Sequence, residues 1–302
     1  MRCTSSSADS PRSGMAKSPA LSSPWLPYLL TAPGVILFFT MVLVPLLLTL
    51  LLSFYGFDSG TGIVAKFSLN NYWQVFSDEY FHSIFLRTFW IAGLTTLICI
   101  VIGAPEAYVL SRMGKPWRSI FLIVILGPLL VSVVVRAFGW SMLLSANGLV
   151  NSAIAWFGFA PLKLLYTTGA VVIALVHVML PFMVIPVWTS LQRLDPTVAQ
   201  AALSLNASPA TVLRRIVLPQ VLPGILSGSL IVFGLSASAF AIPGLLGGRR
   251  LKVVATTVYD EFLGSLNWPL GASIAIILLL ANLLIMLSYN RVLERKYSRT
   301  LG

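Results

Sequence analysis

Long apolar runs alternate with short polar segments along most of this chain. Six of the runs are long enough to cross a bilayer, which takes about 20 consecutive apolar residues, and each is predicted to form one membrane helix. Their expected bounds are 28–54, 84–110, 120–143, 168–191, 221–246 and 270–289. Between the first two runs, Ser68 is placed to cap a short helix. The pattern therefore predicts an all-α membrane protein with six transmembrane helices.

The longest polar interruption, residues 194–219, predicts a pair of short helices. Asp195 is a helix-capping residue type directly before Pro196, whose fixed φ suits the first helical position. Asn206 tolerates the positive φ at which such a helix ends. Ser208 then repeats the capping signal before a second proline. Two short helices joined by a tight turn are therefore expected here.

Apolar residues recur at helical spacing in both short helices. The first helix is expected to carry on one face Val198, Ala201, Ala202 and Leu205. The second is expected to carry on one face Val212, Leu213, Ile216 and Val217, with Arg214 and Arg215 opposite. Because neither helix can span a bilayer by itself, the segment is predicted to be an amphipathic loop outside the membrane.

This segment resembles the cytoplasmic loop of permeases from binding-protein-dependent ABC importers. That family carries Glu-Ala-Ala, three residues, Gly, nine residues, then Ile, any residue, Leu and Pro. The matching positions here, without a gap, are Gln200, Ala201, Ala202, Asn206, Ile216, Leu218 and Pro219. Gln200 replaces a carboxylate, and Asn206 is a common substitute for Gly at positive φ. The resemblance implies that the loop, with Asp195 and Leu205, seats in a groove of an ATPase subunit; the alternative is a helical hairpin lying at the membrane interface.

The composition agrees with a polytopic membrane protein. Hydrophobic residues make up 57% of the 302 residues, charged residues only 10%, and the mean hydropathy is +0.90, which excludes a soluble globular protein. The net charge of +11 does not indicate nucleic-acid binding, because the basic residues lie between apolar runs. Cys3 in the polar tail and Cys99 inside an apolar run are poorly placed to pair.

Lysine and arginine counts predict the orientation. With the N-terminus inside, thirteen basic residues lie on the inner side, six lie outside, and Arg136 lies within a span. This asymmetry favours two cytoplasmic termini and puts residues 194–219 in the cytoplasm, where an ATPase would be. Residues 1–24 are expected to be a disordered cytoplasmic tail and 25–302 a single transmembrane permease domain. Met1 and Met15 are both candidate first residues.

Polar residues inside the apolar runs are candidates for a transport pathway. Ionisable groups in a membrane usually face a bundle interior or an aqueous cavity, which singles out Glu106 and His177. Ser236 and Ser238 lie in a stretch of small residues in the fifth run, which is nearest in sequence to the cytoplasmic loop. For all four the alternative is structural: a hydrogen-bonded side chain or close helix packing. Arg136 is expected to extend toward the outer interface.

The resemblance extends over nearly the whole chain after residue 25, to the permeases of spermidine/putrescine-type importers. The matching stretches are 135–140, 146–151, 164–186, 239–248 and 267–275. The resemblance implies the type I ABC importer permease fold in a bacterial inner membrane, with several passes and contact with lipid. It also implies a cytoplasmic ATPase dimer, a periplasmic solute-binding protein, and a small solute such as a polyamine as cargo. It implies a second permease subunit as well, for which a different chain is expected and a second copy of this chain is the alternative.

The chain is not expected to be an enzyme or to hold a cofactor or metal. No Gly-rich phosphate loop ending in GK[ST] occurs in the sequence, so the energy must come from another chain. One rival is a transporter driven by an ion gradient, but such proteins often show internal repeats and paired acidic residues, and here Glu106 stands alone. The other rival is an intramembrane serine protease, for which Ser236 and His177 supply only the residue types.

Overall fold

The computed structural model describes residues 26–248 and 250–301. The segment 1–24, for which the sequence predicts a disordered tail, lies outside the described residues. In the described part of the chain, helices dominate, as the apolar runs predict. That part also contains one antiparallel pair of short strands, which the sequence reasoning did not predict.

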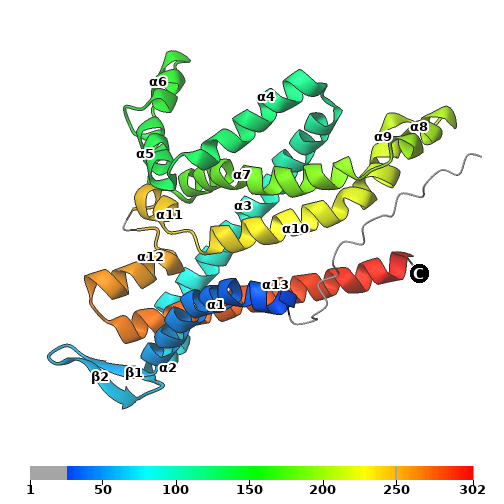
Figure 1. Ribbon diagram of the computed structural model, residues 1–302. Helices are drawn as coiled ribbons and strands as arrows, with labels where there is room; N and C mark the ends of the chain where they lie inside the picture. Colours follow the sequence, from blue (N-terminus) through cyan, green and yellow to red (C-terminus); the bar gives the residue numbers. More distant parts are fainter. Residues whose placement is uncertain (1–25, 249, 302) are drawn as a thin grey trace, which may run out of the picture. The chain divides into compact units, whose positions relative to one another are not determined.

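The described residues form two units, one ending at Leu48 and the other beginning at Thr49. The first contains most of helix α1 (Leu26–Ser53), an apolar helix with two internal prolines. The later elements are drawn in Figure 1. They are β1 (Tyr55–Asp58), β2 (Gly62–Phe67), α2 (Asn70–Ser77), α3 (Glu79–Arg112), α4 (Lys115–Leu126), α5 (Val133–Leu144), α6 (Leu149–Trp156), α7 (Thr168–Gln192), α8 (Pro196–Ser204), α9 (Pro209–Val212), α10 (Leu218–Ala237), α11 (Ala241–Leu246), α12 (Val254–Tyr259) and α13 (Trp268–Leu301).

Within the described residues, six helical stretches are long and apolar enough to cross a membrane, which confirms the predicted number. They are Leu30–Ser53, Glu79–Arg112, Val133–Trp156, Thr168–Gln192, Pro209–Ala237 and Trp268–Arg291. The first, second, fourth and sixth overlap the predicted runs closely. The third and fifth differ, and both differences arise where proline or serine interrupts a helix.

The third predicted run, 120–143, is not one helix. Helix α4 ends at Leu126, a 3₁₀ turn occupies Gly127–Leu130, and α5 begins only at Val133. Pro128 cannot donate the backbone hydrogen bond that a continuing α-helix needs at that position. The third candidate span is instead made of α5 and α6, which are separated by a short break.

The fifth predicted run, 221–246, ends early. Helix α10 stops at Ala237, and the Ser238 hydroxyl donates back to the carbonyls of Gly234 and Leu235 at 2.9 and 3.3 Å. A serine that bonds its own preceding turn competes with helix continuation. The remaining residues form α11, which packs against α5.

Helices α3, α7 and α10 form the core of the second unit, and Figure 1 shows α7 and α10 side by side with α3 crossing them. Small residues allow the close approach. A Cβ atom on Gly103 of α3 would lie 2.9 Å from Met183 Cγ of α7, and one on Gly228 of α10 would lie 3.0 Å from Met183 Sδ. Because Gly103 and Gly228 both lie against Met183, these contacts fix how the three helices are aligned.

The strands β1 and β2 and the helix α2 are held by a buried asparagine. The Asn71 side-chain amide donates to the carbonyls of Ser53 and Tyr55 at 3.2 and 2.8 Å. Ser68 Oγ accepts from the Asn70 N–H at 3.1 Å, but the capping position of α2 is occupied by Leu69 and not, as predicted, by Ser68. Strand β2 begins at Gly62, which has φ 80°, a conformation that glycine adopts without strain.

Candidate functional site

Helices α8 and α9 lie between α7 and α10 in sequence and at one end of both in space (Figure 1). We refer to residues 195–217 as the α8–α9 hairpin. The Asp195 carboxylate accepts a hydrogen bond from the Thr197 N–H at 2.9 Å, which confirms the predicted cap at the start of α8. That hydrogen bond stabilises the charged form and lowers the pKa of Asp195.

The turn between α8 and α9 is a Schellman motif. The Asn206 N–H donates to the Leu203 carbonyl at 3.0 Å, and the Ala207 N–H donates to the Ala202 carbonyl at 3.1 Å. Asn206 itself has φ 63°, the left-handed conformation that the sequence predicts there. Ala202 and Ala207, which flank the turn, are both half-buried and pack against the core. Local hydrogen bonds at Asn206 therefore set the direction in which the chain leaves α8.

The second half of the hairpin runs without interruption into the fifth span. Ser208 Oγ accepts from the Thr211 N–H at 3.2 Å and caps α9. A π-helical turn, Leu213–Val217, then joins α9 to α10 through a bond from the Leu218 N–H to the Leu213 carbonyl. Pro219 follows, and since proline cannot donate to residue 215, the wider turn accommodates it. The hairpin is thus covalently and helically continuous with a membrane span.

The apolar faces of the hairpin are only partly buried. In the second half, Val212 and Val217 are buried at 5% exposure, while Leu213 is exposed. In the first half, Ala202 packs inward, but Val198 is 46% and Leu205 is 84% exposed. The apolar face is therefore buried within this chain more fully in α9 than in α8. The apolar side chains that stay exposed include the large ones Val198, Leu205 and Leu213.

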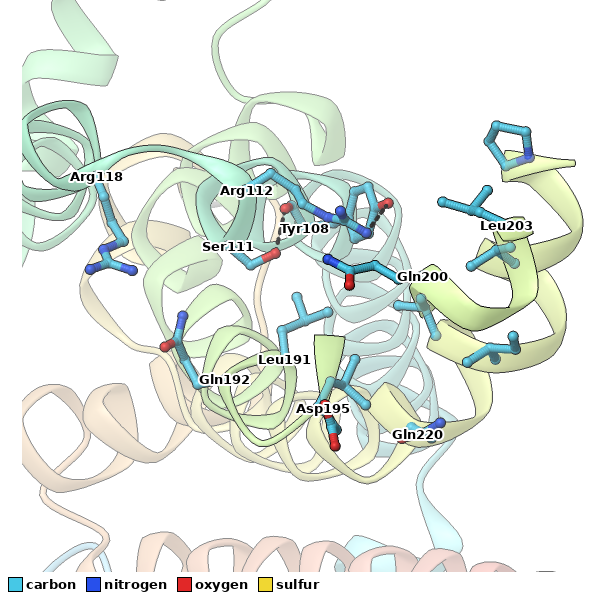
Figure 2. Close-up of a pocket in the computed structure, with 15 residues that line it drawn as sticks. Tyr108, Ser111, Arg112, Arg118, Leu191, Gln192, Asp195, Gln200, Leu203 and Gln220 are labelled. Atoms are coloured by element: carbon cyan, nitrogen blue, oxygen red, sulfur yellow. Dashed lines mark hydrogen bonds between the residues drawn. The ribbon is translucent and has the colours of Figure 1, made fainter. Parts of the chain in front are cut away.

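A cleft of about 450 Å³ separates the hairpin from the end of α3 and the start of α4 (Figure 2). Gln200 of α8 lines it on one side, and Tyr108, Arg112 and Arg118 line it on the other. The Arg112 guanidinium donates to Tyr108 Oη at 3.2 Å, and its carbon lies 5.2 Å from the centroid of that ring. Figure 2 shows the Gln200 amide and the Arg112 guanidinium facing the same space.

The four candidate pathway residues do not form one cluster. Glu106 is half-buried and lies three residues from Gly103, about 4.5 Å toward the hairpin end of the core. His177 lies six residues from Met183 and Ser236 eight residues from Gly228, about 9 and 12 Å toward the opposite end.

The local surroundings of three of them differ. His177 is exposed, and its Nδ1 accepts from Trp140 Nε1 at 3.2 Å. Ser236 Oγ is covered and, in the described part of the chain, has no hydrogen-bond partner, whereas Ser238 is exposed and bonds its own helix. Two guanidinium nitrogens of Arg136, Nε and Nη1, are likewise covered without a partner there. Neighbouring protein atoms therefore cover part of the Arg136 guanidinium.

The residues that sequence reasoning missed are those of α3 and α4 in the cleft. Tyr108 and Arg112 are four residues apart, so they share one helix face, and this spacing is visible in the sequence. Arg118 follows the turn into α4. Their proximity to α8, about 90 residues away in the chain, could not be read from the pattern.

This chain is similar to known transport proteins over most of its length. A family model described as "Binding-protein-dependent transport system inner membrane component" matches residues 100–299. The spermidine/putrescine transport system permease protein PotB of Haemophilus influenzae is 32% identical over 260 residues, which cover 84% of this chain and 91% of that protein. PotB of Escherichia coli K12 is 31% identical over 260 residues, which cover 84% and 94%.

A solved structure shows the same fold. The structure of a bacterial ABC transporter involved in the import of the acidic polysaccharide alginate matches with a TM-score of 0.77. The match covers 90% of this chain and 96% of that chain at 20% identity.

Proposed function

Because this chain belongs to the family of binding-protein-dependent transport system inner membrane components, we propose that it is the permease through which a polyamine or a similar small cation enters the cell. Membership makes the chain a multi-pass inner-membrane subunit of an ABC importer with the type I permease fold. It also makes transport, and not chemical conversion, the activity of the family. The polyamine cargo is inferred from the names of relatives that are 31 to 32% identical over most of the chain.

The α8–α9 hairpin is the proposed contact with a cytoplasmic ATPase dimer. The observation that carries this assignment is the capped helix pair, held by Asn206 at φ 63°, which presents Val198 and Leu205 outward and continues into α10. Exposed leucine and valine on a rigid helix suit insertion into a groove of a partner. Closure of the ATPase upon ATP binding would then move the hairpin and, through Leu218 and Pro219, bias the membrane helices between two arrangements.

Orientation and the remaining partners follow from the same proposal. Both termini and the hairpin face the cytoplasm, in agreement with the excess of Lys and Arg on that side. A second permease subunit of a different chain completes the pathway, and a periplasmic solute-binding protein delivers the cargo. Gln200, Ala201, Ala202 and Ile216 complete the proposed coupling surface, and Glu106, His177, Ser236 and Ser238 remain proposed pathway residues.

Uptake of radiolabelled spermidine tests the cargo. Cells that lack their own polyamine uptake would express this chain together with the other genes of its system. We expect uptake that requires both the chain and an ATPase able to hydrolyse ATP. Uptake that persists with an inactive ATPase but collapses with the ion gradient would favour the ion-driven alternative.

A photo-cross-linking residue at Leu205 tests the coupling surface. We expect it to capture the ATPase subunit in the assembled transporter. Leu130 is the matched control, because it is 91% exposed but lies in the 3₁₀ turn between α4 and α5, away from the hairpin. Capture of the ATPase from position 130 and not from 205, or labelling of position 205 by a reagent confined to the outside, would reject the coupling role.

A further inference from the structure

The cleft between the α8–α9 hairpin and the α3–α4 turn carries a surplus of positive charge. Arg112 and Arg118 both line it, and Asp195 is its only acidic lining residue. The Asp195 carboxylate is already engaged with the Thr197 N–H at 2.9 Å. Among the residues that the structure describes, the single ion pair joins Lys252 to Asp260, far away in the chain. The two cleft arginines therefore have no carboxylate partner within the described residues.

Arg112 contacts a neighbouring tyrosine, which does not neutralise its charge. One hydrogen bond runs from its Nη2 to Tyr108 Oη, and the guanidinium lies over the same ring. A guanidinium has five N–H donors in a planar fork, so most of its donors remain available. This fork matches the oxygens of a phosphate group, which it can bind through two parallel hydrogen bonds.

The surface next to the cleft is apolar and suits lipid chains. Helix α4, which carries Arg118, exposes Trp117 at 64% and Ile123 at 69%. Further exposed apolar residues on this helix are Ile120, Phe121 and Val124. Tryptophan is enriched at the level of the lipid head groups, so Trp117 suits a position at the membrane interface. A ligand with a phosphate head in this cleft and hydrocarbon chains along α4 would satisfy both surfaces.

We propose that this cleft binds the phosphate head group of an anionic phospholipid from the cytoplasmic leaflet. Basic pockets at the cytoplasmic ends of membrane helices recognise such head groups through charge and hydrogen bonds. Gln200 lines the opposite wall, so a bound head group lies between α8 and the end of α3. It steadies the hairpin against the membrane helices in the position seen here. The assignment to the cytoplasmic leaflet rests on the proposed function.

Lipid binding to the purified full-length chain tests this site. Retention of phosphatidylglycerol and of phosphatidylcholine would be measured by native mass spectrometry for the wild type and for the variant with Arg112→Gln and Arg118→Gln. Since each basic residue near an anionic lipid contributes about fivefold in affinity, we expect the double variant to bind phosphatidylglycerol roughly 25-fold more weakly. Binding of phosphatidylcholine should not change.

Arg214→Gln combined with Arg215→Gln is the matched control. These two arginines are exposed on the same end of the molecule but do not line the cleft. They should leave phosphatidylglycerol retention within twofold of the wild type. An equal loss in both double variants would overturn the site in favour of a diffuse basic surface.

Two further measurements test the role of Tyr108 and whether the ligand is a lipid or soluble phosphate. Tyr108→Phe retains the ring but removes the hydroxyl that accepts a hydrogen bond from Arg112. We expect this variant to fold normally and to bind phosphatidylglycerol a few fold more weakly. Inorganic phosphate at millimolar concentration should not displace the lipid; displacement would show a site for soluble phosphate and overturn the lipid assignment. None of these measurements needs the ATPase, the binding protein or a solute, so their failure leaves the proposed transport function untouched.

Discussion

The core of α3, α7 and α10 and the α8–α9 hairpin are stabilised by different kinds of contact. In the core, the helices approach through glycine, and buried apolar side chains such as Met183 and Val232 fill the remaining space at 0% exposure. In the hairpin, the shape comes from caps and turns made by Asp195, Asn206 and Ser208, while Leu205 remains exposed.

This difference indicates different tasks for the two regions. A region that is complete within one chain resists changes of volume, because its side chains have no space to move into. A region held by local hydrogen bonds keeps its shape while offering apolar residues to another molecule. Substitutions in the core should therefore affect the stability of the whole bundle, and substitutions in the hairpin should affect coupling and leave the bundle intact.

Gly224→Ala is expected to have the largest effect. A Cβ at this position would contact Ser190 Oγ and lie 2.6 Å from the Pro186 carbonyl oxygen, and backbone cannot move aside cheaply. We expect a loss of about 1–3 kcal/mol in the stability of the bundle, visible as a lower thermal midpoint of the detergent-purified chain.

Gly93→Ala is its control, because a Cβ there would have nothing within 4 Å and alanine favours a helix. Equal midpoints for the two variants would contradict the close approach of α7 and α10.

Asn206→Val is expected to abolish transport while the bundle stays folded. A β-branched residue at φ 63° is strained by about 1–3 kcal/mol, so the Schellman motif opens and α8 loses its direction. We expect the uptake rate to fall by more than tenfold with unchanged membrane insertion and thermal midpoint.

Asn206→Gly tests the cause of that loss, because glycine adopts positive φ without strain. Transport should remain near that of the wild type. A variant with valine that transports normally would remove the hairpin turn from the mechanism.

Local signals in the sequence were sufficient to predict the α8–α9 hairpin. They were insufficient to predict where the helices end within the third and fifth apolar runs. Asp195, Asn206 and Ser208 act on residues within four positions of themselves, so residue type and spacing predict their roles. Pro128 and Ser238 also act locally, but proline and serine are common within membrane helices, and neighbours often compensate. Their breaks at the third and fifth runs depended on packing that the sequence does not display.

The cleft could not be predicted for a different reason. It exists because the last residues of α3 and α7 lie close together in space, so that Arg112 and Gln200 line the same cleft. Helix direction in a bundle is fixed by long-range packing at residues such as Gly103 and Met183, and no periodic pattern reports it. The same holds for the distances between Glu106, His177 and Ser236, which the sequence grouped only by their polarity.

Ser208→Ala is expected to have a smaller effect than Asn206→Val. Loss of the cap should destabilise the first turn of α9 by about 1 kcal/mol, since the Thr211 N–H loses its acceptor. Exchange of the backbone amides of Ala210, Thr211 and Val212 should quicken roughly fivefold. Ser204→Ala is the control, because its hydroxyl bonds only the Gln200 carbonyl one turn back, at 3.1 Å. Faster exchange that spreads into α10 would show that the hairpin and the core open together.

Protonation of Asp195 should have the smallest effect and only in acid. The hydrogen bond from Thr197 stabilises the carboxylate, so the pKa of Asp195 lies below its ordinary value of about 3.9. The cap is therefore fully present above that value and is lost as the pH falls through the lower pKa of the folded state. Transport measured between pH 5 and 8 should not vary through this group.

The chemical shift of the Thr197 amide, followed in the chain labelled at threonine with ¹⁵N, measures this titration. It should move only below about pH 4, and in Asp195→Asn, which keeps an acceptor oxygen but has no charge, it should not move at all. A transition at or above the ordinary value would mean that the carboxylate does not cap α8. The hairpin would then depend on contacts with the core, and the difference between the two regions would be lost.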